Sequence, residues 1–97
     1  MSNEMTKDLP NGQQITLSGS LKMREFREMA RAEAAGDMDK LYPVYARLIK
    51  RWTVVDEETG KALDPSTAAS YDDLTLGQFK AVSTVVAEYL SETLEKN

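Results

Sequence analysis

The sequence predicts an all-α fold, a small bundle of three to four short helices. Apolar residues recur at the spacing of a helical face in three stretches, and capping or turn residues separate these stretches. Strand-like alternation is confined to residues 15–17, which allows one short strand or hairpin. Residues 1–14 are polar and include a Pro-Asn-Gly turn signal. We therefore expect a flexible N-terminal arm over residues 1–14 and a single helical domain over residues 15–97.

Composition limits the chemistry that is open to the chain. Its 97 residues, 41% of them hydrophobic and 29% charged, are typical of one globular domain. It contains no cysteine and no histidine. A disulfide framework, a cysteine-ligated metal site, a Ser-His-Asp triad and an imidazole proton shuttle are therefore excluded. We expect no enzyme activity, no catalytic or metal-binding residues and no cofactor.

The first helix is predicted over residues 21–35. Ser20 precedes it as a suitable N-cap, and Gly36 follows it where a left-handed residue commonly ends a helix. Its apolar stripe consists of Phe26, Met29, Ala30 and Ala34.

The second helix is predicted from an N-cap at Asp37 or Asp39 to about Trp52. Pro43 lacks a backbone donor and clashes with the carbonyl four residues earlier, so we expect either a kink or a short first turn followed by the main helix from Pro43. The apolar stripe consists of Met38, Leu41, Tyr45, Leu48, Ile49 and Trp52. Residues 53–65 should then form a connector with a reverse turn or small hairpin at Gly60, followed by a short helix over residues 65–72.

The last helix has the clearest start signal. Thr75 and Gln78 match a capping box, and Leu74 and Phe79 have the spacing of a hydrophobic staple. Its apolar stripe contains Val82, Val85, Val86, Tyr89, Leu90 and Leu94. Valine is a weak helix former, so this stripe must pack against another surface.

Short polar motifs are better explained as turns than as sites. Gly60-Lys61 lacks the rest of a phosphate-binding loop, and the acidic stretch from Asp56 lacks the glycine that a calcium-binding loop needs at its sixth position. Adjacent Asp72 and Asp73 precede a helix, where negative charge is favoured. We therefore expect these residues to be structural.

Charge divides the chain into two unlike halves. The net charge is −4, but residues 22–52 carry 8 basic and 5 acidic side chains, whereas residues 53–97 carry 3 basic and 9 acidic ones. This asymmetry favours contact with a polar partner or another copy over general DNA binding. No stretch is apolar enough for a membrane span or a signal peptide, so we expect a cytoplasmic protein.

The amphipathic helices present more apolar surface than a small domain can readily bury. The last helix is the best candidate for the surplus, and an exposed apolar stripe commonly marks a partner site or an oligomer interface. Val82, Val86 and Tyr89 are therefore candidate partner-binding residues.

The order of the features resembles a known family. Residues 15–17 lead into a helix, a second helix closes on Trp52, an acidic turn precedes Leu63, and Leu74 introduces the final helix with Phe79. This order resembles the small tail assembly chaperones of long-tailed bacteriophages over residues 15–94. By position, Trp52, Leu63, Leu74 and Phe79 match the apolar points of the family pattern, and they could serve either the core or a partner site.

The resemblance implies a largely helical, non-enzymatic late protein of phage tail morphogenesis. Such chaperones coat the long helical tape measure protein and keep it soluble until tail tube subunits replace them. They often self-associate, and a longer frameshifted product is common in the family. The resemblance also implies residence in the host bacterial cytoplasm and absence from the mature virion.

Other functions remain open. Lys22, Arg24, Arg27 and Arg31 give the first helix a basic character, as in a small regulatory or nucleic-acid-linked phage adaptor. Glutamates lie between these residues and the C-terminal half is acidic, which weakens that reading. A purely structural role, such as a head–tail connector component, is a further alternative.

Overall fold

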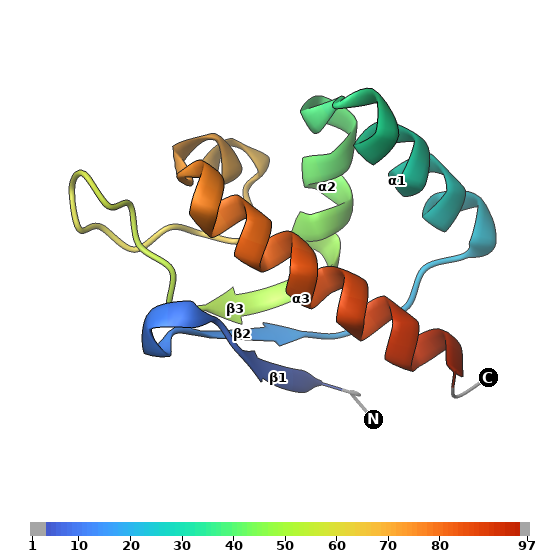
Figure 1. Ribbon diagram of the computed structural model, residues 1–97, viewed down its shortest axis with the longest axis horizontal. Helices are drawn as coiled ribbons and strands as arrows, with labels where there is room; N and C mark the ends of the chain where they lie inside the picture. Colours follow the sequence, from blue (N-terminus) through green and yellow to red (C-terminus); the bar gives the residue numbers. More distant parts are fainter. Residues whose placement is uncertain (1–3, 96–97) are drawn as a thin grey trace.

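The chain folds as a mixed α/β domain rather than an all-α bundle, in a computed structural model that describes residues 4–95 (Figure 1). One antiparallel sheet has the strand order β1-β2-β3. Its strands are β1 (Met5–Asp8), β2 (Gln14–Leu17) and β3 (Ile49–Trp52). The helices are α1 (Met23–Ala35), α2 (Met38–Leu48) and α3 (Leu76–Glu95), with two short 3-10 helices, η1 (Pro10–Gly12) and η2 (Ala68–Asp73). The all-α prediction is wrong because the apolar pattern concealed β1 and β3.

Strand β1 lies in the segment that was expected to be a flexible arm. It pairs with β2 so that Met5 lies opposite Leu17 and Lys7 opposite Ile15. Lys7 faces the helices, and its ammonium group lies 2.9 Å from the carboxylate of Glu92 in α3. A lysine at an inward position removes the apolar alternation by which a strand is recognised. The predicted arm is therefore a strand over residues 5–8, while residues 1–3 lie outside the described part of the chain.

Strand β3 replaces the end of the predicted second helix. Ile49 and Arg51 pair with consecutive residues of β2, which leaves Lys50 as the extra residue of a β-bulge. The bulge puts Ile49 and Trp52 on one face although they are three positions apart, whereas a regular strand repeats every two. A spacing of three also fits a helix, so the pattern extended the helix to Trp52.

The sheet is apolar on one face and polar on the other. Ile15 and Leu17 of β2 are fully buried on the inner face, against which the apolar stripe of α3 packs. On the outer face the hydroxyl oxygens of Thr6 and Thr16 lie 2.9 Å apart. Helices α1 and α2 lie on the same side of the sheet as α3 (Figure 1). The core is therefore a single layer between the sheet and the helices.

Helix α1 starts later than predicted but ends as predicted. It begins at Met23, and the backbone N–H of Lys22 donates to the Glu25 carboxylate at 2.9 Å, so Ser20 is not its cap. At the other end Gly36 has a φ of 70°, and the N–H of Asp37 donates to the carbonyl of Ala32 at 2.8 Å. These are the features of a Schellman motif.

Helix α2 begins before its proline. Asp37 caps it by accepting a hydrogen bond from the backbone N–H of Lys40 at 3.3 Å, and the helix continues through Pro43 to Leu48. The alternative of a short first turn followed by the main helix from Pro43 is therefore wrong.

The connector and the start of α3 follow the prediction more closely. Val55 and Ala62 form an isolated antiparallel bridge around a turn in which Gly60 has a φ of 73°. The short helix predicted over residues 65–72 is the 3-10 helix η2. The capping box is confirmed: the Thr75 N–H donates to Gln78 Oε1 at 2.9 Å, and the Gln78 N–H donates to Thr75 Oγ1 at 3.1 Å. Among residues 4–95, no helix combines the length and apolar content that crossing a membrane requires.

Two glycines at helix ends should respond in opposite directions to alanine. Gly36→Ala should lower the free energy of unfolding by about 1 kcal/mol, because a Cβ is disfavoured at positive φ. Gly77 lies in the first turn of α3, where a Cβ would meet only Thr75 Oγ1 at 3.9 Å. Gly77→Ala should therefore raise the free energy of unfolding by about 0.4–1 kcal/mol. Urea unfolding followed by Trp52 fluorescence measures both, and destabilisation by both would contradict these helix ends.

Candidate functional site

The seven residues predicted to bind a partner divide into two groups, and the first group belongs to the core. Val82, Val86 and Tyr89 are only 1%, 1% and 3% exposed, and the Tyr89 hydroxyl donates to the carbonyl of Gly19. The apolar stripe of α3 was predicted to pack against another surface, and that surface is the inner face of the protein's own sheet. The expectation that the last helix keeps a free apolar stripe here is therefore wrong.

The second group, Trp52, Leu63, Leu74 and Phe79, is half-buried at the edge of the core. Trp52 and Phe79 belong to an aromatic cluster in which they are joined by Tyr42, Tyr45 and Tyr71. Neighbouring ring centroids in this cluster are 5.2–6.3 Å apart, within the usual range for aromatic pairs. The Trp52 indole also donates to the carbonyl of Leu63 at 2.7 Å. Residues from α2, β3, η2 and α3 thus meet in one cluster.

Two tyrosines of the aromatic cluster are structural. The Tyr71 hydroxyl donates to the carbonyl of Pro65 at 2.8 Å, and the Tyr45 hydroxyl donates to Ser83 Oγ at 3.0 Å. Burial raises the pKa of Tyr45 to about 12 and raises the pKa of Tyr71 as well. Both side chains therefore remain neutral hydrogen-bond donors at physiological pH.

Tyr42 occupies the outer edge of the aromatic cluster. Partial burial raises its pKa, and the nearby carboxylates of Asp72 and Asp39 raise it further. Asp72, Asp73 and Asp39 are all exposed. The edge of the aromatic cluster is therefore bordered by negative charge.

An apolar surface opens beside this edge at the start of α3. Leu76 is 70% exposed, far more than the half-buried Phe79 one turn later on the same helix. The Phe79 ring centroid lies 6.0 Å from that of Tyr42. We call Tyr42, Leu76 and Phe79 the Leu76 patch. Sequence reasoning found only Phe79; an apolar residue outside the buried stripe of α3 was the signal that would have identified Leu76.

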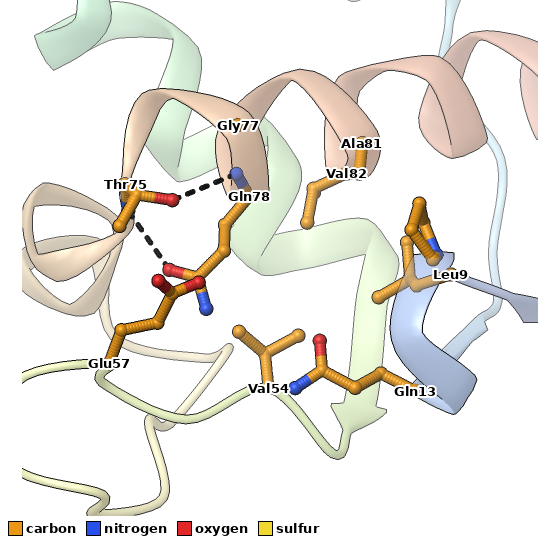
Figure 2. A pocket seen from close by; sticks show the side chains of 10 residues that line it. Leu9, Gln13, Val54, Glu57, Thr75, Gly77, Gln78, Ala81 and Val82 are labelled. Atoms are coloured by element: carbon orange, nitrogen blue, oxygen red, sulfur yellow. Dashed lines mark hydrogen bonds between the residues drawn. The ribbon is translucent and has the colours of Figure 1, made fainter.

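A pocket lies beside the first turns of α3 (Figure 2). Its volume is about 280 Å³, and its walls include the apolar side chains of Leu9, Val54 and Val82. Gln78 forms another wall, and its amide nitrogen donates to the carbonyl of Val55 at 2.9 Å. Glu57 also lines the pocket from the acidic turn (Figure 2), and because it is exposed it marks the solvent side, or mouth, of the pocket. The pocket is thus apolar inside with a carboxylate at its mouth.

Within the described residues, no group of three or more acidic side chains is placed to hold a metal ion. No protein-family model, curated protein or solved structure matches the chain.

Stability should decline at alkaline pH because of the buried tyrosines. Their native pKa values lie above the ordinary value of 10, so the unfolded chain loses these protons first. The stabilising effect is complete below pH 10, and for each tyrosine the free energy of unfolding should then fall by about 1.4 kcal/mol per pH unit until its native pKa is reached. Urea unfolding at a series of pH values from 8 to 12 measures this slope.

The variant Tyr45→Phe provides the control for this prediction. It should be less stable at pH 8 by about 1 kcal/mol, because it lacks the hydrogen bond to Ser83. Above pH 10 its decline should be shallower than that of the native protein. Equal slopes would show that Tyr45 ionises as readily in the folded as in the unfolded chain.

Proposed function

We propose that this protein is a non-enzymatic interaction protein, a tail assembly chaperone that binds the tape measure protein of a long-tailed bacteriophage in the host cytoplasm. The order of its sequence features supports the family. The observation that carries the proposal is the Leu76 patch, in which the most exposed large apolar side chain of the described chain lies one helical turn before Phe79, the partner of Tyr42 in a half-buried aromatic pair.

The shape of the Leu76 patch suits a helical partner. Leu76 and Phe79 are three positions apart, so they form a short ridge along α3 that can pack into the groove of a second helix. Tyr42 adds an aromatic ring to this ridge from α2. An amphipathic client helix would thereby cover its apolar stripe, which is what keeps a long helical protein soluble.

The border of the Leu76 patch suggests the charge of the client. Asp72 and Asp39 are exposed near Tyr42, so a client helix with lysine or arginine beside its apolar stripe would be favoured. The patch is small, and interfaces that bury less than ~1,200 Å² are commonly transient. Such a contact can be displaced, as replacement by tail tube subunits requires.

The variant Leu76→Glu tests this proposal. Glutamate at the first position of α3 interacts favourably with the helix dipole, so the fold should be kept while the apolar contact is lost. When the variant is co-expressed with the tape measure protein of the same phage, the soluble fraction of that client should fall several-fold relative to the native chaperone. The client alone sets the baseline.

Ala87→Glu is the matched control, since it places the same charge on an exposed position of α3 outside the Leu76 patch. This control should keep the client soluble. A native protein that leaves the client insoluble, or a Leu76→Glu variant that acts as well as Ala87→Glu, would contradict the proposal. Circular dichroism of both variants checks that they are folded.

A nucleic-acid-linked adaptor is the second candidate, and an arginine stripe favours it. Arg24, Arg27 and Arg31 are exposed on one face of α1, and no ion pair found within residues 4–95 involves them. Unpaired arginines can contact phosphates. Glu28 lies on the same face and reduces the positive potential, so this function is placed second.

If the adaptor function holds, the native protein should be retained on immobilised DNA at low salt. The double variant Arg27→Ala with Arg31→Ala should then lose retention, because two phosphate contacts are removed. The control variant, Lys61→Ala with Lys80→Ala, loses the same amount of positive charge from another part of the surface. It should still be retained on the DNA. A native protein that passes through the column would exclude this function.

A further inference from the structure

Met23 is the second large apolar side chain that the fold leaves outside. It is 57% exposed at the first position of α1, and both of its neighbours in sequence, Lys22 and Arg24, are exposed as well. A methionine side chain is flexible and adapts to pockets of irregular shape. The start of α1 therefore presents an apolar knob between two positive charges.

The pocket beside α3 is the chemical complement of this knob. At about 280 Å³ it is smaller than the ~300–1,000 Å³ typical of small-molecule sites, so it suits a single side chain. Its inner walls are apolar. The exposed Glu57 lies at its mouth, and the next residue in sequence, Glu58, is also an exposed acid. No ion pair found within residues 4–95 involves either acid.

The knob and the pocket lie at opposite ends of the molecule. Figure 1 is drawn with the longest axis horizontal, and that axis measures 40 Å. The start of α1 lies at the right-hand end of this view, whereas η1, the acidic turn and the start of α3, which surround the pocket, lie towards the left. One molecule cannot bring these two surfaces together, but two molecules placed head to tail can.

We propose that the pocket beside α3 binds Met23 of a second copy of this chain. In this contact Met23 enters between Leu9, Val54 and Val82, while the neighbouring Arg24 approaches Glu57 at the mouth. The two surfaces differ, so the contact is heterologous and each copy keeps one free knob and one free pocket. Repetition therefore builds a row of subunits. The contact uses no residue of the Leu76 patch and does not depend on the proposed function.

The absence of native cysteine allows a direct cross-linking test. Gly77 lines the pocket and has room for a side chain, so Gly77→Cys should place a thiol beside the bound Met23→Cys of another copy. When the two single variants are mixed and mildly oxidised, the disulfide-linked heterodimer should form in large excess over either homodimer. A chain that carries both substitutions should give a ladder of oligomers.

Ser91→Cys supplies the control thiol, since Ser91 is exposed on α3 away from the pocket lining. Mixed with Met23→Cys, it should give only background cross-linking. Mass spectrometry of the tryptic disulfide peptides identifies the joined positions. Equal yields for Gly77→Cys and Ser91→Cys, or a product dominated by Met23→Cys homodimers, would overturn the proposal.

A charge exchange tests the same contact without cysteine. Arg24→Glu and Glu57→Arg should each reduce self-association in sedimentation velocity at low salt, because each places like charges at the mouth of the pocket. The chain with both substitutions should recover it, since the pair is restored with reversed signs. A native protein that stays monomeric at high concentration, or a double variant as weak as the single ones, would refute the contact. Client solubility in the Leu76→Glu experiment tests the proposed function and is measured independently of this self-association.

Discussion

The structure depends on the burial of one helical stripe by one sheet face. The stripe of α3 carries three valines, which do not sustain a helix by their intrinsic propensity, and the inner face of β2 presents two fully buried residues, Ile15 and Leu17. Each element supplies the apolar cover that the other lacks. Removing apolar surface from water contributes about 25 cal/mol per Å², so the contact between these two faces stabilises the domain.

Polar contacts then set how the remaining elements attach to this layer. Lys7 joins the edge strand β1 to α3 through Glu92, and Arg51 joins β3 to the start of the described chain through Glu4. Both ion pairs are at least partly exposed, so each adds little to stability. These ion pairs help to fix the pairing register of the strands, because a strand with few inward-facing apolar residues specifies its register only weakly.

The surface that remains after the core is formed is small and uneven. Five aromatic side chains meet in one cluster, in which Tyr45 and Tyr71 are buried, and the half-buried Tyr42 and Phe79 lie on the side of Leu76. At the far end Met23 stands alone between positive charges. A protein that binds one partner through the first surface and another copy through its pocket would use residues such as Phe79 and Val82 both in binding and in the core.

Some features of this protein follow from its sequence alone, whereas others depend on its tertiary structure. Local signals determined what depends on local chemistry: the capping box at Thr75, the left-handed end at Gly36 and the turn at Gly60. The site was only partly predictable, since Phe79 was identified while Leu76 and Tyr42 were not. Strands β1 and β3 form because they pair with β2, and this pairing joins segments that are far apart in the chain. Their sequences lack a strand-like apolar alternation, because β1 has the inward-facing Lys7 and β3 contains a bulge. The same reason explains the valine stripe: periodicity shows that it must be buried, but only the folded chain decides whether its own sheet or another molecule buries it.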